Sequence, residues 1–201
     1  MTPLKSPYIN RPVTEWASIT KRLIDEFPLS SQALVDVVQA AWSDLFTSSI
    51  GQAKLVIGTD VYLPAQATGV LLERLIIYHL QRLDPKWSGG KNKAHKDVVF
   101  AEDERFSFEI KTSSSRSGLY GNRSNGHRAE ARLKHRTGYY LVVNYKLPTE
   151  EDTRKWLWRI RFGWIDDEDW KGQSQPTGQQ ASVSRHVASL KLVTLFSSDG
   201  E

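Results

Sequence analysis

The spacing of hydrophobic residues changes once along this 201-residue chain, near Pro85. Before Pro85, apolar side chains recur every three or four positions, which predicts amphipathic helices. After it they alternate with polar ones, which is the pattern of β-strands. Helices followed by strands without a clear linker predict one α/β domain, in which a mixed central β-sheet is flanked by α-helices.

The same periods give the expected elements. Two helices are expected on either side of Pro28, and Ser30 or Ser31 is the expected N-cap of the second. A third helix is expected over residues 68–83; it is apolar nearly all round, so we expect it to be buried. Pro85 ends it. Strands are expected at residues 54–57, 97–100, 106–111, 139–145, 156–164 and 187–196.

The composition excludes several classes of site. The chain has no cysteine, which rules out disulfide scaffolds, Cys-ligated zinc and thiol catalysis. The net charge of +4 and the pI of about 9.2 favour an anionic partner. Residues 1–12 lack the apolar stretch of a signal peptide, and residues 70–80 are too few to cross a bilayer. A cytoplasmic location without membrane attachment is therefore expected.

The expected strand at residues 106–111 carries the chemistry. Its alternation places Glu109 and Lys111 on one face, roughly 6.6 Å apart at ~3.3 Å per residue. Asp97, on the preceding strand, adds a second carboxylate. Two carboxylates and a backbone carbonyl, here that of Ile110, are the oxygen ligands that Mg²⁺ prefers. A lysine beside such a metal stabilises charge developing at phosphorus or helps to activate water, so the pattern predicts metal-assisted phosphodiester hydrolysis.

A plainer interpretation of the same strand stays open. An acidic residue two positions before a lysine occurs three times, at residues 84–86, 109–111 and 169–171. Only the second triplet lies in an alternating apolar strand with an aspartate upstream. The alternative to a catalytic site is a solvated strand face that bears an ordinary ion pair.

Glu73 is a further acidic candidate, on the third expected helix. It has apolar neighbours on its own face, and a buried carboxylate needs a cation. Glu73 either pairs with Arg74 or another basic residue, or acts as a third acidic group that holds a second metal or orients Lys111.

The order Glu73, Asp97 and residues 109–111 resembles the PD-(D/E)XK nuclease superfamily, over residues 68–145. The stretches at residues 118–124 and 161–166 also resemble type II restriction endonucleases of the ScaI-like group. The resemblance implies a restriction-endonuclease-like fold and a companion methyltransferase.

The resemblance also assigns roles to these residues. It implies that Asp97 and Glu109 bind Mg²⁺, that Lys111 is the catalytic lysine and that Glu73 belongs to the catalytic set. One departure is Lys96, which stands where the superfamily has a proline. On this reading residues 1–201 form a single nuclease domain, with a helical N-terminal part (1–67), a catalytic core (68–145) and C-terminal strands and loops (146–201).

A local excess of positive charge begins at Lys111, at the end of the expected strand at residues 106–111. Residues 111–136 contain seven basic residues and one acidic residue, a net charge of +6. Short polar side chains and arginines there suit contacts to phosphates and base edges, although a merely solubilising loop would have the same composition. A short basic helix is expected at residues 128–136. The predicted DNA contacts are Thr112, Ser113, Ser114, Ser115, Arg116, Asn122, Arg123, Ser124, Asn125 and Arg128.

The C-terminal third offers two features that we interpret as structural. Trp156, Trp158, Trp164 and Trp170 are expected to pack in the core or over the sheet. The acidic residues 166–169 are expected to form a solvated turn or a helix N-terminus rather than a metal site.

The sequence therefore predicts a Mg²⁺-dependent, site-specific endonuclease for double-stranded DNA, acting as a homodimer on a palindrome. Two alternatives remain open. One is a structure-selective DNA repair or recombination nuclease with the same core. The other is a non-catalytic nucleic-acid-binding module in which Glu109 and Lys111 form a structural ion pair.

Overall fold

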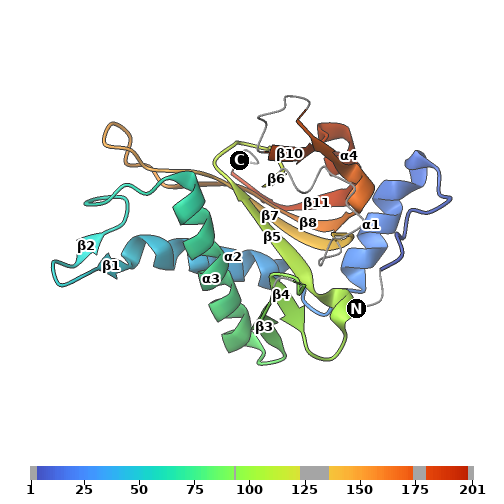
Figure 1. Cartoon of the computed structure of the whole chain (residues 1–201), viewed down its shortest axis with the longest axis horizontal. Coiled ribbons are helices and arrows are strands. Elements are labelled where there is room, and N and C mark those ends of the chain that lie inside the picture. Colours follow the sequence, from blue (N-terminus) through green and yellow to red (C-terminus); the bar gives the residue numbers. More distant parts are fainter. Residues whose placement is uncertain (1–3, 93, 123–135, 174–179, 199–201) are drawn as a thin grey trace.

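A six-stranded mixed sheet forms the centre of the computed structural model, which describes residues 4–92, 94–122, 136–173 and 180–198 (Figure 1). The strand order is β11-β8-β7-β5-β4-β3, and every neighbouring pair is antiparallel except β5 and β7, which are parallel. The strands are β3 (Trp87–Gly89), β4 (Val98–Phe100), β5 (Phe108–Ser113), β7 (Gly138–Lys146), β8 (Trp156–Ile165) and β11 (Leu192–Ser197).

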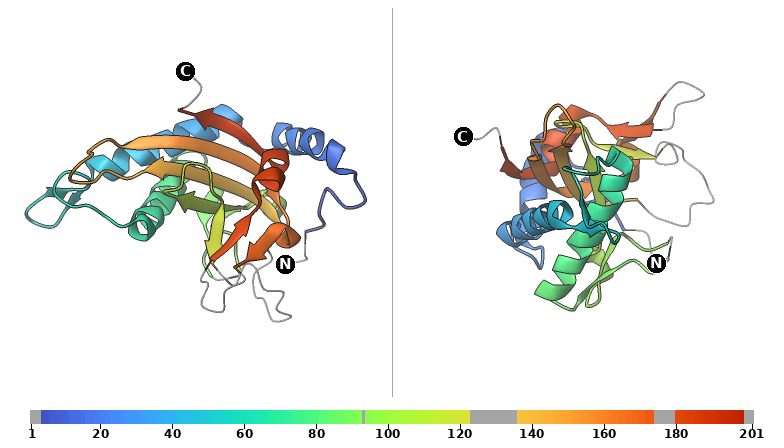
Figure 2. Two further views of the ribbon diagram at one scale, coloured as in Figure 1. Left: turned by 90° about the horizontal axis from the view of Figure 1, so that it is seen from above. Right: turned by 90° about the vertical axis from the view of Figure 1, so that its left-hand side faces the viewer.

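Two layers cover the sheet, one on each face (Figure 2). Helices α1 (Trp16–Asp25) and α2 (Ser31–Thr47) lie along one face. A smaller antiparallel sheet lies over the other, in the order β6 (Tyr120–Asn122), β10 (Gln180–Val183) and β9 (Trp170–Gly172). A two-stranded hairpin, β1 (Ser49–Ile50) and β2 (Leu55–Val56), follows α2. The mixed α/β architecture with flanking helices is therefore confirmed.

The alternation of β7 shows how the two faces are filled. Tyr139, Leu141 and Val143 pack with the residues of α1 and α2, whereas Tyr140 and Val142 pack in a second cluster with the small sheet. Glu109 and Lys111 are the register partners of Tyr140 and Val142 on the parallel strand β7. Because residues opposite each other in register share a face, both charged side chains lie on the face that bears the small sheet.

The expected helices form close to their predicted limits. Ser30 caps α2, and its Oγ accepts a hydrogen bond of 3.1 Å from the amide of Ala33. The third helix is α3 (Ala65–Leu83), and the expectation that it is buried all round is wrong. Val70 and Tyr78 on its outer side are 55% and 50% exposed. The reason is that α3 packs against α2 and the sheet on one side only, among the residues that the structure describes.

Two expected strands are wrong in part. Residues 187–191 belong to helix α4 (Arg185–Lys191), which Ser184 caps by accepting a hydrogen bond from Val187. Only the remainder of that segment forms β11. Similarly, Phe106 ends a 3-10 helix (Glu104–Phe106) that the side chain of Asp103 caps, so β5 begins two residues later than expected. In both places a local capping side chain overrides the two-residue period.

Across the described part of the chain, no helix combines the length and the hydropathy that a membrane span requires.

Candidate active site

Three oxygen atoms gather around the ammonium group of Lys111. Its Nζ donates to the carbonyl oxygen of Ile110 at 3.1 Å and to Oε2 of Glu109 at 3.3 Å, and it lies 3.6 Å from Oδ2 of Asp97. These are the two carboxylates and the carbonyl that the sequence singles out. The structure brings them together at one point of β5, and the amine is at the centre of the group.

Asp97 reaches this point from the residue that precedes β4. Its Oδ2 accepts a hydrogen bond of 2.9 Å from the backbone amide of Ile110, which fixes the carboxylate against β5. The side chains of Lys111 and Asp97 are 22% and 18% exposed, but that of Glu109 is only 5% exposed. Solvent therefore reaches the site from the side of Lys111 and Asp97.

A second lysine lies behind Glu109. Lys96 is 4% exposed, and its Nζ is 3.8 Å from Oε1 of Glu109. The same Nζ donates to the carbonyl oxygen of Thr137 at 3.2 Å and lies 5.5 Å from the ring centroid of Tyr140. Two carboxylates and two ammonium groups thus form one cluster of zero formal charge. Sequence reasoning treated Lys96 only as a departure from a motif, because its burial and its partners are tertiary features.

Helix α3 covers the end of β5 closely. A Cβ atom at Gly69 would lie 2.5 Å from Oγ1 of Thr112, so this contact requires glycine. Further along the helix, Ile77 contacts Gly89 of β3. Glu73 is one helical turn beyond Gly69 and is partly buried, so it lies on the α3 surface that runs from β5 towards β3. Its catalytic role stays a prediction.

Two buried polar side chains hold the loop that follows β5. Asn144 donates from Nδ2 to the carbonyl oxygens of Ser115 and Gly118, at 2.8 and 2.9 Å. Arg161 donates to the carbonyl oxygen of Ser117 at 2.9 Å and to Oδ1 of Asn144 at 3.0 Å. Burial lowers the pKa of Arg161 to about 10, which leaves the guanidinium charged at neutral pH. Sequence reasoning missed both residues, because their register opposite this loop is a tertiary feature.

The predicted DNA contacts lie in different surroundings. Ser113 and Ser115 accept hydrogen bonds from backbone amides within their own loop, so both hydroxyls help to shape it. Arg116 is exposed, and its guanidinium lies 5.0 Å from the ring centroid of Trp158. The side chain of Thr112 lies against Gly69 of α3. Ser114 is exposed, and Asn122 belongs to β6. Arg123, Ser124, Asn125 and Arg128, together with most of the expected helix at 128–136, lie outside the described residues.

We expect Asn144→Ala to loosen this loop without disrupting the sheet. The substitution leaves two carbonyl oxygens without their donor, which costs about 1–3 kcal/mol of unfolding free energy. Urea unfolding measures that loss, and a gel-shift titration with duplex DNA should show weaker binding. Arg116→Ala is the matched variant: it should weaken DNA binding with little change in stability. Equal stability and DNA affinity of Asn144→Ala and the wild type would contradict the role given to Asn144.

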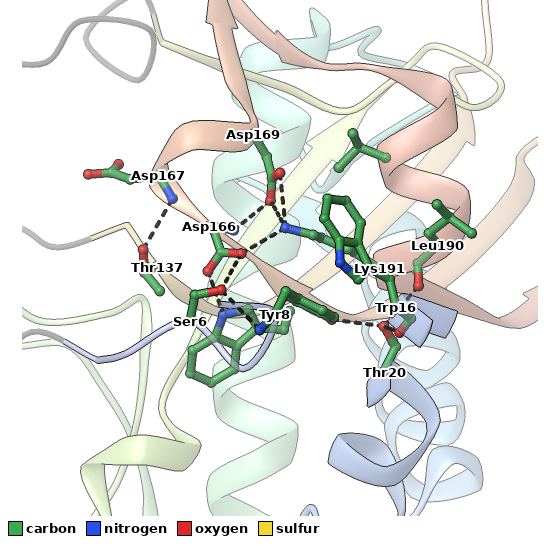
Figure 3. A network of polar contacts seen from close by, with 12 residues as sticks. Ser6, Tyr8, Trp16, Thr20, Thr137, Asp166, Asp167, Asp169, Leu190 and Lys191 are labelled. Carbon is green, nitrogen blue, oxygen red and sulfur yellow. Dashed lines mark hydrogen bonds and ion pairs between the residues drawn. The ribbon is translucent and has the colours of Figure 1, made fainter. Parts of the chain in front are cut away.

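The acidic turn is not a solvated one. Lys191 is buried, and its Nζ contacts Oδ2 of Asp166 at 2.7 Å and Oδ2 of Asp169 at 2.8 Å (Figure 3). The rings of Tyr8 and Trp16 lie 4.3 and 4.4 Å from the same nitrogen. Burial raises the pKa of Asp169, although Lys191 acts in the opposite direction. The turn starts a 3-10 helix (Asp167–Asp169) with Asp166 as N-cap, so the expectation of a helix N-terminus is confirmed and that of a solvated turn is wrong.

The tryptophans of the C-terminal third differ in their burial. Trp164 and Trp170 are buried, as expected for packing residues. Trp156 is 40% exposed and stacks on Trp158, with ring centroids 5.8 Å apart, so for Trp156 the expectation of core packing is wrong.

The sequence matches a protein family over nearly its whole length. The family model described as ScaI restriction endonuclease matches residues 6–196. The chain belongs to the ScaI restriction endonuclease family. Within this family, it is 37% identical over 192 residues to the type II restriction enzyme ScaI of Streptomyces caespitosus, a match that covers 94% of this chain and 84% of that protein.

Two solved structures have a related shape. One is the tetrameric restriction endonuclease SfiI bound to cognate DNA, with a TM-score of 0.44 and 11% identity over 98% of this chain and 90% of that one. The other is the restriction endonuclease BglI bound to its DNA recognition sequence, with a TM-score of 0.45 and 10% identity over 92% of this chain and 91% of that one. At these scores the assignment to the ScaI family depends on the sequence alone.

Proposed function

We propose that this chain is a Mg²⁺-dependent, site-specific endonuclease that hydrolyses phosphodiester bonds in double-stranded DNA, a type II restriction enzyme. The observation that supports it best is the convergence of Asp97, Glu109 and the carbonyl of Ile110 on Lys111. Membership of the ScaI restriction endonuclease family supports the same activity.

The donor atoms of the cluster suit a hard divalent cation. All three are oxygens, and Mg²⁺ is commonly bound by one or two carboxylates together with water and substrate phosphate. Among the described residues there is no group of three His, Cys, Asp or Glu side chains able to hold a metal. The protein ligands would be the carboxylates of Asp97 and Glu109 and the carbonyl of Ile110, and restriction endonucleases generally use divalent ions. A bound metal would supply the charge that acidifies water and stabilises an anionic phosphorus centre.

The residues around the proposed metal site have separate roles. The hydrogen bond from the Ile110 amide keeps Asp97 in place, and burial keeps Glu109 in place. Lys111 is the more exposed of the two lysines, so it is positioned to donate hydrogen bonds to a phosphate oxygen as water attacks the phosphorus and the 3′-oxygen leaves. The proposed DNA side of the molecule is the loop after β5, where Thr112 to Arg116 would contact the backbone and Asn122, Arg123 and Asn125 would read bases.

A cleavage assay on phage DNA tests the proposal. With Mg²⁺ the protein should produce discrete fragments, and EDTA should abolish them. Sequencing the fragment ends would then identify the recognition site and the cut position. The Lys86→Met variant, altered at an exposed ion pair with Glu102, should cut like the wild type.

The other outcomes separate the alternative functions. A smear instead of bands would retain a nuclease but remove sequence specificity, as expected for a structure-selective repair enzyme. Tight DNA binding without cleavage under Mg²⁺ or Mn²⁺ would favour a non-catalytic binding module and contradict the proposal.

We also propose that the active form is a homodimer. The described residues contain one such catalytic cluster, whereas a double-strand break requires two hydrolysed bonds. Two copies related by a two-fold axis would place one cluster on each strand of a palindrome. Light scattering of the protein in solution should give twice the mass of one chain.

A further inference from the structure

We propose that Lys96 is a positioning residue that holds the buried carboxylate of Glu109 in its metal-binding orientation. The proposal depends on the metal site proposed above, and it concerns a lysine that the nuclease motif does not include. The side chain of Lys96 is only 4% exposed, so it lies in the interior beside Glu109.

The surroundings of Lys96 form a dedicated place for its ammonium group. Its Nζ lies between the carbonyl oxygen of Thr137, Oε1 of Glu109 and the face of the Tyr140 ring. Gly138 makes room for it: a Cβ there would lie 3.3 Å from Nζ, and the φ of +146° favours glycine. Thr137 is itself held, because its Oγ1 accepts a hydrogen bond from the amide of Asp167 (Figure 3). The chain thus builds a fixed acceptor and an aromatic wall around this lysine.

The two lysines contact different oxygens of Glu109. Lys96 is 3.8 Å from Oε1, and Lys111 is 3.3 Å from Oε2. This division turns Oε2 towards Asp97 and Lys111, the place proposed for the metal, and directs Oε1 into the protein. A buried carboxylate is costly without a cation nearby.

Exposure decides which lysine stays with Glu109 during the reaction. Lys111 is 22% exposed and is proposed to turn to the phosphate, whereas the side chain of Lys96 is only 4% exposed and stays in the interior. Lys96 therefore keeps the Glu109 carboxylate oriented when Lys111 is engaged elsewhere. The alternative is that Lys96 only fills space and satisfies the Thr137 carbonyl.

Simple electrostatics and positioning predict opposite results for the loss of Lys96. Removing a cation from the neighbourhood of a metal site, with nothing else changed, would tighten metal binding. Removing a residue that orients a ligand should weaken it, by about 10- to 100-fold for partners of metal-ligating side chains. The sign of the change in metal affinity therefore separates the two.

The experiment measures Mn²⁺ affinity by electron paramagnetic resonance, on the full chain with duplex DNA present. Lys96→Met is expected to raise the Kd for Mn²⁺ by about 10- to 100-fold relative to the wild type. Lys96→Gln keeps a donor for Thr137 but no charge, should also weaken binding, and serves if the methionine variant does not fold. Lys86→Met is the control and should bind Mn²⁺ like the wild type. Thermal unfolding verifies that each variant is folded.

A double-mutant cycle shows whether Lys96 acts through Glu109. In a Glu109→Gln background, Lys96→Met should cause no further loss of Mn²⁺ affinity, because the group that Lys96 positions is already gone. Unchanged or tighter Mn²⁺ binding by folded Lys96→Met and Lys96→Gln would overturn the inference while leaving the metal site intact. Failure of the wild type itself to bind Mn²⁺ would instead overturn the proposed metal-dependent function, and the inference with it.

Discussion

Lys111→Met should lower the single-turnover rate of DNA cleavage by about 10²- to 10³-fold, the usual cost of removing one donor to a developing anion. The substitution leaves Asp97 and Glu109 in place, so the oxygens of the proposed metal site remain. It removes the cation that lies within 3.6 Å of both carboxylates and of the Ile110 carbonyl. DNA affinity, measured with Ca²⁺ in place of Mg²⁺, should change little.

The chain supplies its own controls for this substitution. Lys86 and Lys171 also follow an acidic residue by two positions, but in other surroundings. Lys86 forms an exposed ion pair with Glu102, and Lys171 is exposed while its neighbour Asp169 pairs with Lys191. Methionine at either position should leave cleavage unchanged. A Lys111→Met variant that cuts at the wild-type rate would show that Glu109 and Lys111 form only a structural ion pair.

The largest loss of stability is expected from Lys191→Met, at about 3–5 kcal/mol of unfolding free energy. The lysine is 2% exposed and neutralises Asp166 and Asp169, which are themselves largely buried. Without it, two carboxylates remain in the interior with their principal cation removed. The damage should extend to the N-terminal segment, because Tyr8 and Trp16 pack on the same ammonium group (Figure 3).

Urea unfolding at several pH values tests this expectation and its cause. Burial raises the pKa of Asp169, so the folded state favours its protonated form; this contribution is present at low pH and is lost as the pH rises through the folded pKa. Removing Lys191 removes an opposing influence and enlarges this effect. The stability gap between variant and wild type should therefore shrink as the pH falls from neutrality towards about 4, the ordinary pKa of aspartate. Adding Asp166→Asn and Asp169→Asn should recover part of the loss at pH 7, and a gap that grows on acidification would contradict the account.

The strand that carries Glu109 and Lys111 was predictable because its information is local. The two-residue alternation of residues 106–111 is enough to place Glu109 and Lys111 on one face, and a nearby aspartate in the preceding segment limits the partners. The structure adds that the Ile110 amide holds Asp97, which depends on how β4 pairs with β5. Such pairing depends on the tertiary structure, so the sequence of either segment alone does not predict it.

Lys96 illustrates the other case. Its partner Thr137 is 41 residues away, and Tyr140 reaches it only because β7 runs parallel to β5 in one particular register. In a sequence, a lysine next to an aspartate looks like surface charge. Only the structure shows that Lys96 is buried. The same holds for Asn144, Arg161 and Lys191, which are polar residues whose buried partners lie far along the chain.

Helix α4 was missed for a different reason. Its seven residues are too few to establish a helical period, and the apolar residues that follow suggest a continuous strand. Ser184 caps the start of the helix locally, and the packing of α4 against α1 and β8 stabilises it. Short helices at strand boundaries depend on such tertiary support.

The most direct test of the central claim is to locate the metal. Crystals of the protein with duplex DNA and Mn²⁺ should show an anomalous difference peak bounded by the carboxylates of Asp97 and Glu109 and by the Ile110 carbonyl, next to a DNA phosphate. The peak should disappear in the Glu109→Gln variant. A peak at another place, with none beside Asp97 and Glu109, would contradict the assignment of this cluster as the catalytic centre.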